Sequence, residues 1–171
     1  STVAYLPIEF LHDGVPQLEL YSEWKTPEHK PFTYSNDVDH NQLLIDLLSR
    51  PNIASKETWV RQYDHEVIAQ TAVKPFVGVE RDGPADAGVI APIHGRTNGL
   101  VISCGINPRY SDIDAGIMAA AAIDEAVRNA VCVGVDVDKI AGLDNFCWPD
   151  PIESEKTPDG RFKLAQLVRA N

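Results

Sequence analysis

Basic residues and long apolar runs are both scarce in this sequence of 171 residues. Lys and Arg total 15 against 25 Asp and Glu, so the net charge is −10 at pH 7. Nonspecific binding to a phosphate backbone depends on clustered Lys and Arg, and we therefore expect no nucleic-acid partner. The longest mainly apolar run, Ile117 to Val135, is interrupted by charged side chains such as Asp124 and Arg128. Because it cannot cross a bilayer without burying charge, we expect no membrane span.

Targeting signals and cysteine motifs are missing as well. The N-terminus shows no basic region followed by an apolar stretch and a small-residue cleavage site, so we expect a cytoplasmic protein. Cys104, Cys132 and Cys147 are an odd number without CxxC spacing, which predicts neither a disulfide framework nor a zinc site. We expect these thiols to be reduced and packed in the core.

No common catalytic signature is found either, since the sequence contains no GxxxxGK[ST], HExxH or GxSxG segment. The length and the 44% content of hydrophobic residues are sufficient for one domain with a core. The sequence therefore gives no support for a phosphate-binding loop, a zinc protease or a serine hydrolase.

The N-terminal part predicts two short strands followed by a linker. Residues 3–11 and 17–21 are strand-like runs on either side of the turn-forming pair Asp13-Gly14. Residues 25–31 are polar and carry two prolines, which is typical of an extended arm.

The middle of the chain changes to helical and then to strand patterns. Leucines at helical spacing predict a helix that begins at Asp39 as N-cap and ends before Pro51, and a short helix is expected from Ser55 through Tyr63. Strands are then predicted over residues 65–74, 87–93 and 99–104, with a turn between the last two. Together these strands predict an antiparallel meander.

The last third predicts a long helix, a strand and a final helix. The long helix has Asp112 or Asp114 as N-cap, a face of small residues that permits close packing, and an end near Gly134. A strand is expected over residues 139–146, and apolar residues after Asp159-Gly160 predict the final helix. The order predicts an α+β fold with helices on one face of a mainly antiparallel sheet.

The first candidate site is the segment from Cys104 to Asp114, between a strand and the long helix. It contains Asn107, Arg109 and Tyr110. Backbone N–H groups at a helix start attract anions, and a guanidinium binds phosphate as a planar fork. The two aspartates of the segment would repel a phosphate unless a magnesium ion intervened. The alternative is a capped helix with Arg109 in a structural ion pair.

Asp144 is the second candidate, because it lies at the end of the predicted strand 139–146. Ligand-binding carboxylates are common at strand ends of this kind, where they accept hydrogen bonds from an adenine amine or a ribose, or hold a metal. The alternative is a turn formed by Asp144 and Asn145.

A third cluster, Tyr63-Asp64-His65-Glu66, stands at the start of a predicted strand. Alternate strand residues share a face, so Asp64 and Glu66 would point together as a base or as metal ligands. The alternative is that His65 is a hydrogen-bonded structural residue.

These segments together resemble a known enzyme family. The sequence closely resembles the synthetase subunit of phosphoribosylformylglycinamidine synthase in five blocks, which follow one another in the same order. The blocks are residues 63–67, 85–89, 107–114, 121–129 and 143–148. Several blocks in the same order are more specific than any single motif. That family resembles a duplicated aminoimidazole ribonucleotide synthetase, with N-type and C-type domains alternating along the chain.

The resemblance implies an ATP-dependent ligase. In the family, ATP phosphorylates the amide of formylglycinamide ribonucleotide, ammonia made from glutamine by a glutaminase domain or subunit displaces phosphate, and Mg²⁺ neutralises the transferred group. Residues 1–54 would be the tail of a C-type domain plus a linker, and residues 55–171 an incomplete second N-type domain. The catalytic histidines and main Mg²⁺ ligands belong to the first N-type domain, so no catalytic or metal-binding residue is assigned here.

The resemblance also assigns the cofactor-binding residues. In the family the nucleotide lies in a cleft where two N-type domains meet. Asp144 would contact the nucleotide, and Asn107, Arg109 and Tyr110 would line the cleft or contact the neighbouring domain. Many members carry Thr before the aspartate where this chain has Leu143, so a hydroxyl contact is missing.

Two other functions are alternatives to the ligase, and the same fold also predicts a state of association. A scaffold or dimerisation module of the same fold would bind no ATP, and a kinase-like relative would carry a glycine- and acid-rich nucleotide segment, which is not seen in this sequence. The resemblance also implies that two N-type domains share a barrel-like sheet. One such domain alone would expose apolar strand surface, so we expect self-association through the sheet.

Overall fold

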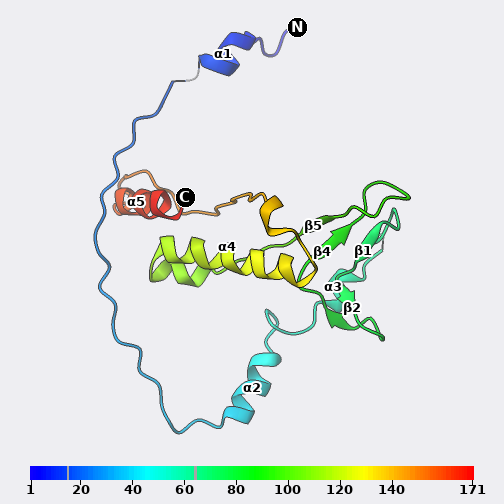
Figure 1. Ribbon diagram of the computed structural model, residues 1–171. Helices are drawn as coiled ribbons and strands as arrows, with labels where there is room; N and C mark the ends of the chain where they lie inside the picture. Colours follow the sequence, from blue (N-terminus) through cyan, green and yellow to red (C-terminus); the bar gives the residue numbers. More distant parts are fainter. Residues whose placement is uncertain (15, 64) are drawn as a thin grey trace. The chain divides into compact units, whose positions relative to one another are not determined.

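The computed structural model describes residues 1–14, 16–63 and 65–171, and it consists of two compact units (Figure 1). One unit combines residues 1–26 with 146–169 and 171. The other contains residues 27–145 and residue 170. The described elements are helical segments and short strands, which makes the chain α+β as expected.

Helix α4, Ala115–Cys132, is the longest element of the larger unit. Its N-cap is Asp114, whose side chain accepts a hydrogen bond from Ile117 N–H at 3.0 Å. The chain leaves the helix through Gly134, which has a φ of 91° that suits glycine. The predicted helix and its end are therefore confirmed, and Asp114 is the cap of the two candidates.

A three-stranded antiparallel sheet lies beside α4 in the larger unit (Figure 1). The order is β1 (Thr71–Val73), β4 (Gly88–Ile90), β5 (Leu100–Ile102), with an irregular register between β1 and β4. These are the three predicted meander strands, each shorter than expected. The hairpin of β2 (Phe76–Val77) and β3 (Gly83–Pro84) was not predicted, because its strands are too short to show a period of two.

Close backbone contact joins the end of β5 to α4. A Cβ added at Gly105 would lie 1.9 Å from the carbonyl oxygen of Ala122, so only glycine fits there. Just before it in the chain, Ser103 Oγ donates to the Ala126 carbonyl at 2.8 Å, and the Cys104 carbonyl accepts from Asn129 Nδ2 at 3.1 Å. The small residues of α4 permit this approach, as the pattern predicted.

The remaining helices of the larger unit are short. Helix α2, His40–Leu48, is capped by Asp39, which accepts from the N–H groups of Asn41 and Gln42. Helix α3, Glu57–Val60, is shorter than predicted, although Ser55 Oγ accepts from the Glu57 N–H. Two 3-10 helices, η1 (Pro108–Asp112) and η2 (Val137–Lys139), flank α4.

The smaller unit is built on helix α5, Gly160–Ala170, as predicted from its apolar spacing. The Trp24 ring contacts both Phe162, at 5.5 Å between ring centroids, and the Arg169 guanidinium, 4.2 Å from the ring centroid. The Glu23 N–H donates to the Arg161 carbonyl at 3.1 Å. The N-terminal arm is therefore fixed to the C-terminal helix within this unit.

Several predictions about local structure are wrong. Helix α1 (Ile8–Asp13) begins inside the first predicted strand and continues past its end, and residues 17–21 have no regular structure. The predicted strand 139–146 is also absent, because the chain continues from η2 without a pairing partner and Leu143 is 94% exposed. Alternating apolar residues form a strand only where a neighbouring strand and a covering layer are available.

The cysteines are free but exposed, so their predicted place in the core is wrong. Cys104 follows β5 in an outward position that alternates with the half-buried Ser103, which faces α4. Among the described residues, the buried apolar side chains all belong to alanines, such as Ala87 and Ala115, and no large side chain is fully buried. No helix in that part of the chain is long and apolar enough to cross a membrane.

Candidate functional site

The predicted nucleotide-binding segment, Cys104 to Asp114, runs from the end of β5 through η1 to the N-cap of α4. Asn107 is half-buried, and its Nδ2 donates to Glu125 Oε2 on α4 at 2.7 Å. The Asn107 carbonyl accepts the Tyr110 N–H at 3.0 Å, and Pro108 provides the fixed φ with which η1 begins. Asn107 therefore holds η1 against α4, and its amide group is already engaged.

Arg109 and Tyr110 lie on η1 with their side chains toward solvent. Tyr110 is 47% exposed, and Arg109 is exposed without a hydrogen bond or ion pair to any described residue. As the alternative predicted, the long helix is capped, by Asp114, but the described residues give Arg109 no ion pair. A free guanidinium and a phenol side by side remain available to a ligand.

Asp144 is exposed and belongs to no strand, since residues 140–150 have no regular structure. The strand-end argument for this carboxylate is therefore wrong, and so is the alternative of an Asp-Asn turn. No hydrogen bond or ion pair among the described residues joins Asp144 to Asn107, Arg109 or Tyr110. Nucleotide contact through Asp144 stays a prediction.

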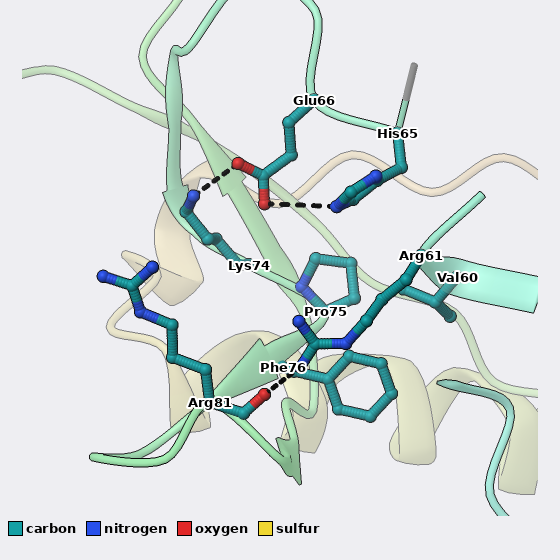
Figure 2. Close-up of a pocket in the computed structure, with 8 residues that line it drawn as sticks. All are labelled: Val60, Arg61, His65, Glu66, Lys74, Pro75, Phe76 and Arg81. Carbon is teal, nitrogen blue, oxygen red and sulfur yellow. Dashed lines mark hydrogen bonds and ion pairs between the residues drawn. The ribbon is translucent and has the colours of Figure 1, made fainter. Parts of the chain in front are cut away.

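A pocket of about 170 Å³ lies at the third candidate cluster (Figure 2). It is formed by the end of α3, the segment before β1, the β1–β2 connection and the β2–β3 loop. Its lining residues are Val60, Arg61, His65, Glu66, Lys74, Pro75, Phe76 and Arg81. Asp64, part of the predicted cluster, lies outside the described residues.

Glu66 is bound by Lys74 across the pocket. The Lys74 Nζ donates to Glu66 Oε2, and His65 Nε2 lies 4.0 Å from Glu66 Oε1 (Figure 2). The hydrogen bond from Lys74, more than any other cause, holds the pKa of Glu66 below its ordinary value, against a desolvation effect that raises it. The lowered pKa makes the Glu66 carboxylate a weak base, and Lys74 already occupies one of its oxygens, so both features disfavour a role as general base.

His65 fits the structural alternative. Its Nδ1 lies 2.9 Å from the Gln62 carbonyl, which sets this nitrogen as the N–H donor. His65 and Glu66 are adjacent in the chain, so the sequence predicted them as a pair. The cations around them, Arg61, Lys74 and Arg81, were not predicted, because only the fold brings them together.

Arg61 is held in place from three sides. It pairs with Glu57 at 2.7 Å on α3, its guanidinium carbon lies 5.1 Å from the Phe76 ring centroid, and it donates to the Arg81 carbonyl. Arg81 itself has a φ of 56°, which a non-glycine residue rarely adopts. The Arg81 guanidinium has no hydrogen bond or ion pair to a described residue, and Figure 2 shows it extending away from Arg61.

The described part of the chain brings together no group of three or more His, Cys, Asp or Glu side chains that could hold a metal ion.

Sequence comparison relates the chain to one enzyme subunit. Similar proteins include "Phosphoribosylformylglycinamidine synthase subunit PurL" of Methanothrix thermoacetophila, 37% identical over 116 residues, which are 68% of this chain and 14% of the relative. The subunit PurL of Anaeromyxobacter dehalogenans is 33% identical over 99% of this chain and 22% of its own length. The subunit PurL of Picrophilus torridus is 32% identical over 96% of this chain and 22% of its own length.

The similarity is extensive on this chain but partial on the relatives. The chain spans about a fifth of the length of the curated relatives it matches. No protein-family model matches the chain, and no solved structure matches it. With identities of 32–37% over as much as 99% of its residues, the chain belongs to the family of the phosphoribosylformylglycinamidine synthase subunit PurL.

Proposed function

We propose that this chain is part of an ATP-dependent carbon–nitrogen ligase that converts formylglycinamide ribonucleotide, glutamine and ATP to formylglycinamidine ribonucleotide. The proposal is supported by the similarity to PurL over as much as 99% of the chain. In the whole enzyme a glutaminase domain or subunit supplies the ammonia. The chain alone is inactive, because the catalytic histidines and main Mg²⁺ ligands belong to another domain.

Within that enzyme, the chain forms one wall of the nucleotide cleft. The wall belongs to a domain of the aminoimidazole ribonucleotide synthetase type that begins near residue 55. Three features of η1 support this role. Asn107 fixes η1 to α4 through Glu125, and Arg109 and Tyr110 are exposed beside it. A free guanidinium is suited to a phosphate, and a phenol to stacking or hydrogen bonding. Asp144 is exposed and available to a base or a ribose, although Leu143 offers no hydroxyl.

Titration of the 171-residue chain with ATP and Mg²⁺, followed residue by residue by NMR, tests this role. We expect saturable shifts at Arg109 and Tyr110, and Arg109→Gln should weaken binding about tenfold, as the loss of one charge-assisted hydrogen bond implies. Arg50→Gln is the matched control, because Arg50 is exposed, makes no side-chain bond to a described residue and lies outside η1. Equal affinities for both variants, or no saturable shift, would favour the scaffold alternative.

A further inference from the structure

The pocket between α3 and the β2–β3 hairpin has a charge balance that contrasts with the rest of the chain. Arg61, Lys74 and Arg81 are three cations against one lining carboxylate, Glu66. Even with Glu57, the partner of Arg61 outside the lining, the balance stays positive. In a chain of net charge −10, such a local concentration of positive charge attracts small anions.

The cations are not equally available to a ligand. Lys74 is bound to Glu66, and Arg61 is held by Glu57, Phe76 and the Arg81 carbonyl. Of these three cations, only the Arg81 guanidinium lacks a hydrogen bond or ion pair to the described residues. Its backbone adopts a left-handed φ of 56°, while its carbonyl is tied to Arg61. Because the Arg81 backbone is already anchored, ligand binding has to order only the side chain of this residue.

We propose that this pocket, with Arg81 as the free donor and Lys74 and Arg61 as supporting cations, binds a small oxyanion and prefers a phosphate group. The volume of about 170 Å³ is below the range of about 300–1,000 Å³ typical of pockets for larger organic ligands. It therefore accommodates one anionic group and not a whole nucleotide. Guanidinium forks match the geometry of phosphate oxygens, and a dianion gains more from a positive pocket than a monoanion.

This site is separate from the residues proposed to contact nucleotide on η1, and it does not depend on the ligase assignment. None of Asn107, Arg109, Tyr110 or Asp144 lines the pocket. Failure of phosphate binding here and failure of ATP binding at η1 are distinguishable, because the two titrations shift different residues.

The test is an NMR titration of the 171-residue chain with inorganic phosphate, at an ionic strength held constant with sodium chloride. We expect saturable shifts at Arg61, Lys74 and Arg81, with a weaker response to acetate. Arg81→Gln should lower the affinity for phosphate about tenfold, whereas Arg50→Gln, with the same charge change outside the pocket, should leave it unaltered.

Three outcomes would overturn the proposal. The first is the absence of saturable shifts at the pocket residues, and the second is an equal loss of affinity in both variants, which would indicate a general charge effect. The third is tighter binding of acetate than of phosphate. Circular dichroism of Arg81→Gln checks folding, and Lys74→Gln provides a second variant that should weaken phosphate binding if Arg81→Gln does not fold.

Discussion

Glycine at position 105 is the residue on which the packing of the larger unit depends most sharply. A Cβ there would lie 1.9 Å from Ala122 O on α4, and backbone atoms cannot move aside as a flexible side chain can. Gly105→Ala should therefore destabilise the chain by about 1–3 kcal/mol, the usual cost of overpacking. Urea denaturation measures the loss. Gly142→Ala is the matched control, since nothing lies within 4 Å of its added Cβ, and an equal loss in both variants would contradict the account.

The Glu66–Lys74 pair gives a pH dependence with a defined sign. The pKa of Glu66 is lowered in the folded chain, chiefly by the hydrogen bond from Lys74, so the pair contributes stability above the ordinary glutamate pKa. That contribution is lost as the pH falls through the lowered pKa. Glu66→Gln should reduce the stability difference between neutral and acidic pH, as measured by thermal unfolding across that range. An unchanged pH profile in this variant would contradict the pairing.

At the scale of elements, the N-cap of α4 is the most direct test of the helix assignment. Asp114→Ala removes the acceptor for the Ile117 N–H and should cost about 1 kcal/mol. Asp112→Ala should cost less, because Asp112 lies in η1 and caps nothing in α4. Comparison of urea midpoints distinguishes the two aspartates, and a larger loss for Asp112→Ala would show that the helix begins elsewhere.

The contact between the N-terminal arm and helix α5 gives a second prediction about the elements. Trp24→Ala removes the contacts with Phe162 and Arg169, so the amide protons of α5 should exchange faster with solvent. Tyr21→Ala is the control, because Tyr21 lies in the same arm and is largely exposed. Hydrogen exchange of α5 that is equal in the two variants would mean that Trp24 does not hold the arm.

The sequence predicted those elements whose signals are local. The caps Asp39 and Asp114 and the spacing of apolar residues in α2, α4 and α5 are properties of adjacent residues, and all three helices are confirmed. The strand expected over residues 139–146 is wrong, because pairing depends on a partner strand that local alternation cannot reveal. For the same reason the pocket cations were missed, since 20 positions of sequence separate Arg61 from Arg81.

At the scale of the whole molecule, exposed apolar side chains predict self-association. Leu100 and Ile102 of β5, at the edge of the three-stranded sheet, are 53% and 57% exposed. An apolar sheet edge favours pairing with another chain, so light scattering should show a mass above 18.8 kDa that rises with concentration. Ile102→Glu should reduce that mass, whereas Ile117→Glu on α4, also at an exposed position, should not. A monomer at high concentration would contradict the prediction.

Membership in the PurL family makes the exchange of segments the most direct test of the proposed ligase function. Residues 1–171 would replace the matching segment of the Anaeromyxobacter dehalogenans subunit PurL, whose similarity covers 99% of this chain. The hybrid subunit would be assayed for formylglycinamidine ribonucleotide formation from ATP, ammonia and formylglycinamide ribonucleotide. The account predicts that it retains activity and that Arg109→Gln raises its KM for ATP while Arg50→Gln does not. A hybrid that folds and binds the ribonucleotide but forms no product would contradict it.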